Sequence, residues 1–132
     1  MIILSQTTDK LQVKLNDTAT KQMDCFVTWR DNRLEPVVIL NVFTPNRTIA
    51  TTNDTTKVTL VEGPAENLKR TVDFISIHNK NGSAHKVTIL FDDGTVNVIL
   101  WKGEIAADER LQYTDTNGFT VFTAIGAIKY AV

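Results

Sequence analysis

Two histidines are the residues whose type and spacing come closest to a reaction centre. His78 and His85 flank the dipeptide Asn81-Gly82, which favours a tight hairpin turn. Such a turn would bring the two imidazoles onto neighbouring strands, where they could share a metal ion such as Zn²⁺. Protein zinc sites normally have three or four side-chain ligands, and the sequence offers no third ligand at a matching spacing. We therefore expect no metal and interpret both histidines as surface or strand-end residues.

The other chemically capable side chains have simpler structural interpretations. Asp92 and Asp93 could act as an acidic pair, but aspartate is a preferred residue in hairpin loops. Cys25 lies in a run that predicts a buried strand, where a free thiol is an inert small hydrophobic group. Three more acidic residues flank predicted turns and are expected to be solvated: Asp108, Glu109 and Asp115. We find no nucleophile elbow, phosphate-binding glycine loop or zinc-type Cys/His spacing, and predict a protein that is not an enzyme and needs no cofactor.

Composition and charge exclude several classes of protein. The chain has 132 residues, which suits a single domain, and its 42% hydrophobic and 22% charged content is typical of a globular protein. A net charge of -1 offers no basic excess for phosphates, so we expect no nucleic-acid partner. The longest apolar stretch, residues 37–43, is too short to cross a bilayer, and no basic signal-peptide segment precedes it. We expect no membrane association.

The elements that must position these side chains all have the pattern of β-strands. Residues 11–15 alternate between apolar and polar, as a half-buried strand does. Residues 26–29 and 37–40 are more uniformly apolar and predict central strands covered on both faces. Residues 48–52 and 56–61 are rich in threonine and valine, which is typical of strands near a sheet edge.

Three hairpins are predicted in the second half of the chain. A two-residue loop at Asp93-Gly94 would give apolar cross-strand pairs on one face. These pairs are Phe91 with Val96, Ile89 with Val98 and Val87 with Leu100. The third hairpin joins residues 111–113 to residues 119–121 through the turn Asp115-Thr116-Asn117-Gly118.

The first hairpin, around Asn81-Gly82, admits two registers. A two-residue turn would pair the histidines but turn Ile75 and Ile77 away from the apolar face of the next strand. A three-residue loop over residues 80–82 restores the apolar match, so we predict that loop and unpaired histidines. A bulge near Asp73 is then needed for Val72 and Phe74 to face inward as well.

These elements predict an all-β fold: an antiparallel two-sheet β-sandwich, immunoglobulin-like or jelly-roll-like, with a C-terminal β-meander of hairpins. We expect one domain over residues 1–132. Short strands would occupy residues 1–62, the meander residues 70–125, and an apolar tail residues 126–132. Trp29 and Trp101 are expected in the core between the sheets.

Two segments are candidates for contact with other molecules. Residues 44–59 form either a sheet edge open to strand addition or a solvated hairpin. The apolar C-terminal segment, residues 122–132, is either a last strand tucked into the sandwich or a contact with a neighbouring subunit. The predicted interface residues are Thr48, Ile49, Thr51, Thr52, Ile125, Ile128, Tyr130 and Val132.

Several stretches along nearly the whole chain resemble a type of small protein encoded by tailed phages. They are SQTTDKLQVKL, FVTWRD, NRTIATTNDTTKV, ISIHNKNGSAHKVTILFDDGT and ERLQYTDTNGF. The chain departs from that pattern by a longer segment at residues 33–42 and by its extended apolar C-terminus. The resemblance carries over no catalytic residue. It implies a structural protein of the virion, assembled in the host cytoplasm.

The expected role is a capsid decoration or cement protein that stabilises the shell through contacts between subunits. Its expected partners are the major capsid protein or other virion proteins, and copies of itself in a homo-oligomer, with a trimer favoured. One alternative is a component associated with the tail, baseplate or fibre. A second is a carbohydrate-binding module in which exposed Trp101, Tyr113 or Tyr130 would stack on sugar rings.

Overall fold

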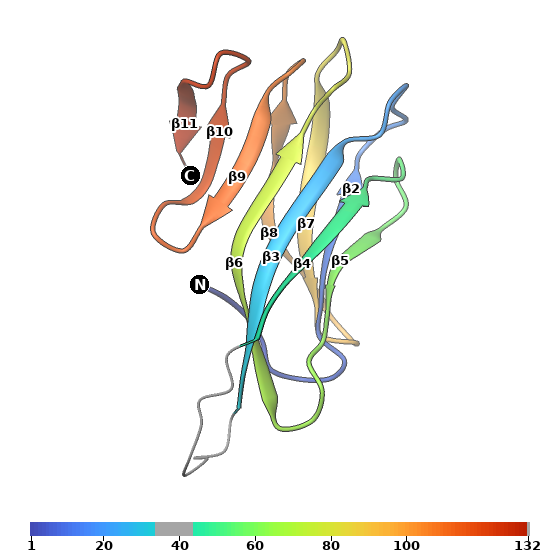
Figure 1. Cartoon of the computed structure of the whole chain (residues 1–132). Coiled ribbons are helices and arrows are strands. Elements are labelled where there is room, and N and C mark those ends of the chain that lie inside the picture. Colours follow the sequence, from blue (N-terminus) through green and yellow to red (C-terminus); the bar gives the residue numbers. More distant parts are fainter. Residues whose placement is uncertain (34–43, 132) are drawn as a thin grey trace.

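Two antiparallel β-sheets pack face to face in the computed structural model, which describes residues 1–33 and 44–131 (Figure 1). The predicted fold class, an all-β two-sheet sandwich, is confirmed. The larger sheet has the order β11-β10-β9-β6-β3-β4, with β1 beside β6, and the smaller has the order β5-β2-β7-β8. The strands are β1 (Ile2–Leu4), β2 (Lys10–Leu15), β3 (Asp24–Arg33), β4 (Thr44–Thr51), β5 (Val58–Glu62), β6 (Leu68–His78), β7 (His85–Asp92), β8 (Asn97–Ile105), β9 (Arg110–Thr114), β10 (Gly118–Phe122) and β11 (Ile128–Ala131).

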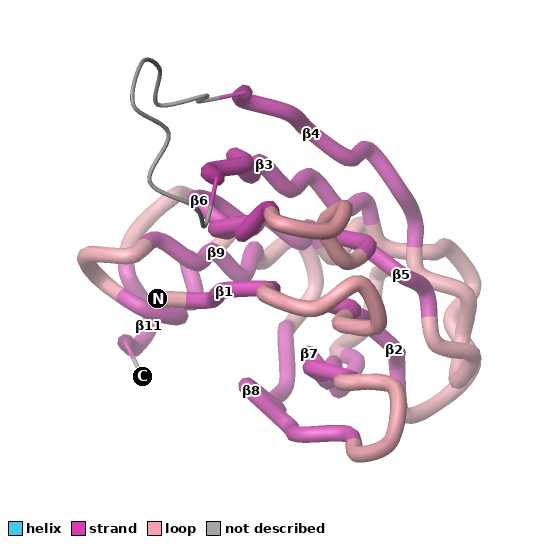
Figure 2. The backbone as a smooth tube through the Cα atoms, turned by 90° about the horizontal axis from the view of Figure 1, so that it is seen from below, coloured by secondary structure: helices cyan, strands magenta, loops and turns pink. Residues whose placement is uncertain are grey.

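The neighbours of the central strands follow an immunoglobulin-type order. β3, β6 and β9 lie side by side in one sheet, and β2 and β5 lie side by side in the other. These correspond to the C-F-G and B-E neighbours of an immunoglobulin sandwich. β7 occupies the other side of β2, where the first strand of an immunoglobulin domain would lie. Figure 2 shows the two layers end on, with β4 and β5 on one side of the molecule and β8 and β11 on the other.

The core between the two sheets is built from residues that alternate along the strands and point inward. Leu11, Val13 and Leu15 of β2 are fully buried, and the alternation predicted for this segment is confirmed. Trp29 and Trp101 are only 8% and 5% exposed, as expected for core aromatics. No helix in the described part of the chain is long and apolar enough to span a membrane.

β3 is central in its sheet but is not covered on both faces. Cys25, Val27 and Trp29 face the core, whereas the intervening Phe26 is 38% exposed. The prediction of a strand covered on both faces is wrong for this segment, because nothing in the described structure packs on the outer face of the larger sheet. The matching prediction for residues 37–40 lies outside the described residues.

The threonine-rich strands are at sheet edges, as predicted, but they do not form a hairpin. β4 ends the larger sheet and β5 ends the smaller one, so the chain crosses from one sheet to the other between them. The interpretation of residues 44–59 as a solvated hairpin is therefore wrong. Availability of either edge for strand addition stays a prediction.

The β7–β8 hairpin is present with a different register. Its loop covers residues 93–96, and Phe91 pairs with Val98 rather than with Val96. A bulge between Ile89 and Leu90 then brings Ile89 opposite Trp101, and the predicted pairs are wrong. The longer loop is stabilised by the Asp93 carboxylate, which accepts hydrogen bonds from the backbone N–H groups of Thr95 and Val96 at 2.8 and 2.7 Å.

The segment around Asn81-Gly82 is a crossing between sheets and not a hairpin. β6 belongs to the larger sheet and β7 to the smaller one. The predicted three-residue loop is therefore wrong. The predicted bulge at Asp73 is confirmed: the register shifts there, and Val72 is fully buried. Phe74, however, faces outward and is only half-buried.

The third hairpin is confirmed. Tyr113 pairs with Phe119 and Leu111 pairs with Val121, on the two sides of a turn that ends at Gly118 with a φ of 65°. β11 continues this pair, so the C-terminal β-meander consists of β9, β10 and β11. It does not extend over all of residues 70–125, because β7 and β8 lie in the other sheet.

Candidate protein-binding face

The outer face of the larger sheet joins the two segments predicted to make contacts. Residues that are direct partners in an antiparallel sheet point to the same face. Pairing from strand to strand runs from Ile49 on β4 through Phe26, Ser76 and Gln112 to Thr120 on β10. A parallel row ends at Phe122 and Ile128 on the opposite edge. Ile49 and Thr51 on β4 therefore lie at one end of a continuous face, and Phe122 and Ile128 lie at its other end.

An apolar group occupies the β4 end of this face. Ile49 is 74% exposed and lies directly across from Phe26, which is 38% exposed. The ring of Phe26 contacts that of Phe74 edge to face, with centroids 6.3 Å apart and planes at 62°. Such a pair contributes about 0.5–1.5 kcal/mol beyond area burial and holds the two rings in a fixed orientation.

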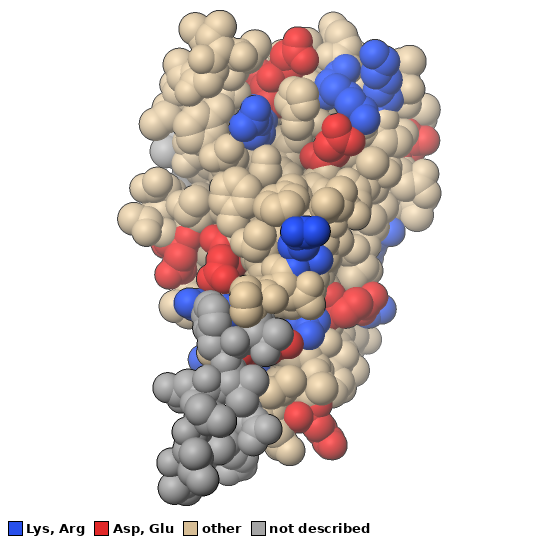
Figure 3. Space-filling model, in the orientation of Figure 1, with Lys and Arg blue, Asp and Glu red and all other residues tan. Residues whose placement is uncertain are grey.

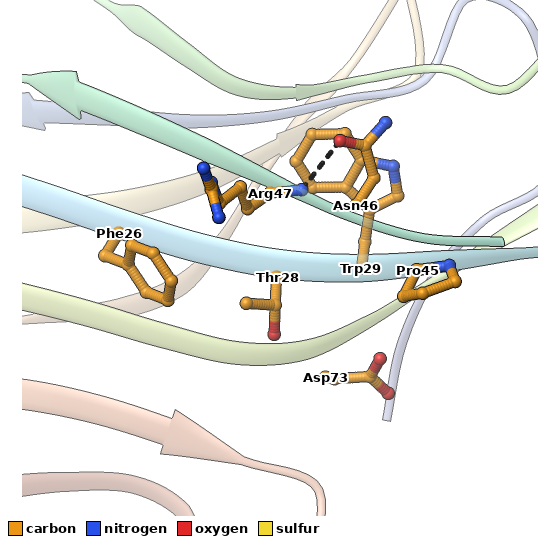
Figure 4. Close-up of a pocket in the computed structure, with 7 residues that line it drawn as sticks. All are labelled: Phe26, Thr28, Trp29, Pro45, Asn46, Arg47 and Asp73. Carbon is orange, nitrogen blue, oxygen red and sulfur yellow. Dashed lines mark hydrogen bonds between the residues drawn. The ribbon is translucent and has the colours of Figure 1, made fainter.

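A shallow groove of about 660 Å³ lies beside this apolar group (Figure 4). Phe26 and Thr28 line it from β3, Pro45, Asn46 and Arg47 from β4, and Asp73 from the bulge of β6. Asn46 Oδ1 accepts a hydrogen bond from the backbone N–H of Arg47 at 2.8 Å. The groove thus has an aromatic wall and a polar wall carrying one cation and one carboxylate, which suits an amphipathic protein surface.

A second apolar group occupies the β10–β11 end. Ile125 is 92% exposed at the tip of the connecting turn, and Ile128 is 66% exposed beside half-buried Phe122. The turn is ordered by two backbone hydrogen bonds, from Thr123 N–H to the Ala127 carbonyl at 2.7 Å and from Gly126 N–H to the Thr123 carbonyl at 2.9 Å. These hydrogen bonds order the turn from which Ile125 and Ile128 project toward solvent.

Between the two apolar groups the face is polar, and the row that ends at Phe122 runs through Asp24, His78 and Arg110. Figure 3 shows this face, with basic and acidic side chains scattered over a largely uncharged surface. Lys80 Nζ lies 2.9 Å from Asp24 Oδ1, and His78 Nε2 lies 3.8 Å from Asp108 Oδ1. Both pairs are at least one-third exposed, where ion pairs contribute about 0–1 kcal/mol. The face therefore has an apolar group near each of its two edges and polar side chains between them.

The predicted interface residues differ in how exposed they are. Ile49 and Thr51 are exposed on β4, and Ile125 and Ile128 are exposed at the other edge. Thr48 is half-buried and paired with core residue Val27.

Thr52, which was also predicted as an interface residue, is 1% exposed. Its hydroxyl accepts a hydrogen bond from the N–H of Met23 and donates one to Gln22 Oε1. Tyr130 lies in β11, and Val132 is outside the described residues.

The prediction overlooked Phe26 and Phe74. The alternation of inward and outward side chains along a strand could have identified them. Phe26 alternates with the inward-facing Cys25 and Val27, so it must point outward. Phe74 follows the same rule once the bulge at Asp73 is taken into account.

The two histidines lie in different sheets. His78 is on β6, and His85 is on β7, where its Nδ1 lies 2.9 Å from Asp17 Oδ1. The described residues contain no group of three or more histidine, cysteine, aspartate or glutamate side chains that could hold a metal ion. The arrangement of two histidines on adjacent strands, which suggested a metal site, is absent from the part of the chain that the structure describes.

One acidic residue predicted to be solvated is buried. Asp108 and Asp115 are exposed as expected, but Glu109 is only 6% exposed. Its Oε1 accepts hydrogen bonds from the N–H of Ala106 at 2.9 Å and from Lys129 Nζ at 3.0 Å. Glu109 therefore links the β8–β9 turn to β11, which a reading based on turn propensity does not detect.

Cys25 is a core residue, as predicted. It is 2% exposed, and burial, with a smaller contribution from the Asp24 charge, raises the pKa of its thiol to about 12. A thiol of this kind is un-ionised at neutral pH and unreactive as a nucleophile.

Two of the residues expected to stack on sugar rings, Trp101 and Tyr113, are buried. Trp101 is 5% exposed and stacks on Phe119, with ring centroids 6.2 Å apart. Tyr113 is 4% exposed, with its ring centroid 5.0 Å from that of Phe119. The carbohydrate-binding interpretation based on these two aromatics is wrong, because their ring faces are occupied by core contacts.

The chain was compared with models of protein families, with curated proteins and with solved structures, and none of these comparisons finds a match.

Proposed function

We propose that this protein is a non-enzymatic structural protein of a tailed-phage virion, which decorates or cements the capsid shell. The observation that carries the proposal is the outer face of the larger sheet. It presents Ile49 with Phe26 at one edge and Ile128 with Ile125 at the other, on one side of a sandwich. The resemblance of the sequence to small tailed-phage proteins supplies the virion context.

Such a face suits attachment to a shell of repeated subunits. Two separated apolar groups can contact two neighbouring shell subunits at once, with the polar strip above their junction. Each contact buries apolar area worth about 25 cal/mol per Å², from which association and ordering costs are deducted. Weak contacts engaged at two points gain effective affinity because the second contact is intramolecular.

Quantitative mass spectrometry of purified phage particles that encode this chain tests the proposal. A capsid decoration protein should be present in hundreds of copies per particle, because the shell repeats many times. About a dozen copies or fewer would indicate a tail, baseplate or fibre component, the second candidate role, and would contradict the capsid assignment. Absence from particles would overturn the virion role altogether.

The partners expected under this proposal are the major capsid protein and other copies of this chain. A particle map that resolves subunits would show which symmetry axis the chain surrounds and whether three copies meet there. Contact through the outer face of the larger sheet is the expected result. Attachment through the outer face of the smaller sheet would contradict the proposed mode of binding.

A further inference from the structure

Three places in the chain have an asparagine or aspartate directly before a glycine. They are Asn81-Gly82, Asp93-Gly94 and Asn117-Gly118. At such a pair the glycine nitrogen can attack the side-chain carbonyl carbon and close a succinimide ring, because glycine has no Cβ to hinder the approach. Ring closure needs a side chain that is free to rotate toward this nitrogen. The tertiary structure gives the three side chains very different freedom to do so.

Asn81 is held away from this reaction in the folded protein. It is 4% exposed, and its Oδ1 accepts a hydrogen bond from the N–H of Lys21 at 2.8 Å. Its Nδ2 donates to the Lys21 carbonyl at 2.6 Å and to Asn79 Oδ1 at 3.0 Å. Rotation would break all three hydrogen bonds inside the protein. The backbone at Gly82 is open, since a Cβ there would have nothing within 4 Å, so the hold on the Asn81 side chain is the restraint.

Asp93 is exposed, but its ionisation opposes the reaction. Ring closure from an aspartate proceeds through the protonated carboxyl group, which loses water. The backbone N–H groups of Val96 and Thr95 donate to Asp93 Oδ1 at 2.7 and 2.8 Å and lower the pKa of this carboxyl group. The side chain is therefore ionised at neutral pH and is held within its loop.

Asn117 has neither restraint. It is exposed in the β9–β10 turn, and its side-chain amide has no hydrogen-bond partner in the part of the chain that the structure describes. Its backbone N–H donates to Thr114 Oγ1 at 3.1 Å. Gly118 begins β10, and its pair with Thr114 is the last of the β9–β10 ladder. End pairs of this kind open with free energies close to zero, so the Gly118 nitrogen becomes available while the sandwich stays folded.

We propose that Asn117 is a site of spontaneous deamidation in the folded protein, and that burial protects Asn81 from the same reaction. The Gly118 nitrogen gives its proton to solvent and bonds to Cγ of Asn117, the Cγ–Nδ2 bond breaks, and ammonia leaves. Water then opens the succinimide at one of its two carbonyl carbons and gives aspartate or isoaspartate. Water is the only co-reactant, and no atom changes its oxidation state.

The isoaspartate product changes the main chain as well as the charge. It adds a methylene group to the backbone between residues 117 and 118, one residue before the Phe119–Tyr113 pair. Both of these rings are buried, and Phe119 stacks on Trp101 across the core. The lengthened turn no longer fits the register that holds these rings, so the isoaspartate form should be less stable than the original chain.

The test is incubation of the folded full chain in mildly alkaline buffer for several weeks, followed by peptide mapping with mass spectrometry. The same chain in concentrated urea is the reference, because both asparagines are then unrestrained. We expect folding to slow conversion of Asn117 by less than about tenfold, and to slow conversion of Asn81 by about 100-fold or more, because Asn81 must first be released from its buried position. Asn117→Ser is the matched control and should give no product at this position.

A second measurement concerns the isoaspartate product. This form is separated by anion-exchange chromatography and identified by labelling with an isoaspartyl methyltransferase. It should melt at a lower temperature than freshly prepared protein. The variant Asn117→Asp, which carries the same charge on a normal main chain, should melt close to wild type.

Three results would overturn the inference. They are conversion of Asn81 as fast as that of Asn117 in the folded protein, conversion of Asn117 slowed by folding as strongly as that of Asn81, and an isoaspartate form that melts with the fresh protein. The reaction needs no other molecule than water, so its outcome is independent of attachment to particles and leaves the proposed function to its own test.

Discussion

At the scale of single residues, Gly63 shows how closely the backbone packs around the β1–β2 connection. A Cβ atom at this position would lie 2.6, 2.6 and 2.8 Å from the carbonyl oxygens of Gln6, Thr7 and Asp9. Backbone atoms cannot withdraw as the end of a flexible side chain can. The glycine is therefore required by close approach, and no feature of the local sequence reveals that requirement.

The variant Gly63→Ala should lower the free energy of unfolding by about 1–3 kcal/mol, the usual cost of overpacking. Urea denaturation at neutral pH measures the difference. Gly82→Ala is the matched control, because a Cβ there has nothing within 4 Å, and its stability should stay close to wild type. Equal stability of the two variants would contradict the close approach.

The buried thiol of Cys25 predicts a dependence of stability on alkaline pH. Its pKa is raised from 9.0 to about 12 in the folded protein. Above pH 9 the unfolded chain therefore releases a proton that the folded chain retains, which favours unfolding. Wild type should lose up to about 1.4 kcal/mol per pH unit relative to Cys25→Ala between pH 9 and 12. Urea denaturation of both proteins across this range is the measurement, and a constant difference between them would refute the prediction.

At the scale of elements, the crossing from β6 to β7 depends on one buried side chain. Asn79 is fully buried, and its Nδ2 donates to the carbonyls of Ser83, Ile105 and Ala106 at 3.0, 2.9 and 3.1 Å. Its Oδ1 accepts the N–H of Asn81 at 2.9 Å. The side-chain amide of Asn79 thus forms hydrogen bonds with backbone groups of two connections, β6–β7 and β8–β9. This explains why residues 79–84 form a corner between sheets and not the hairpin that Asn81-Gly82 suggests.

The variant Asn79→Ala should be strongly destabilised, by about 2–4 kcal/mol, because it leaves several buried backbone groups without partners. Thermal unfolding monitored by circular dichroism provides the measurement. Asn117→Ala, at an exposed position in the β9–β10 turn, is the control and should melt close to wild type. A small effect at position 79 would mean that water or a rearranged backbone replaces the amide.

At the scale of the whole molecule, the proposed binding face combines strands that are distant in the sequence. β4 and β11 are the two edges of one sheet, and the apolar residues near them act together only if both edges contact the same partner. Binding through such a face depends on both groups, because loss of either removes the intramolecular advantage of the second contact.

Ile49→Lys and Ile128→Lys should each reduce attachment to phage particles that lack the chain, by about tenfold or more, and the double variant should abolish it. Attachment is measured by co-sedimentation with the particles. Neither single variant should change the melting temperature, because both side chains are mostly exposed. Thr116→Lys, in an exposed turn, is the charge-matched control. Unchanged attachment of the double variant would contradict the proposed face.

The sequence by itself determined the local elements. Period-two alternation at residues 11–15 and the hairpin turn at residues 115–118 depend on neighbouring residues only, and the structure confirms them. The tertiary structure alone decided which sheet each strand joins. Pairing partners are set by contacts between distant segments, so β6 and β7 separate even though a hairpin signal lies between them. It also decided that Trp101 and Tyr113 face the core while Ile49 and Ile128 share a surface, because burial depends on what the opposite sheet covers.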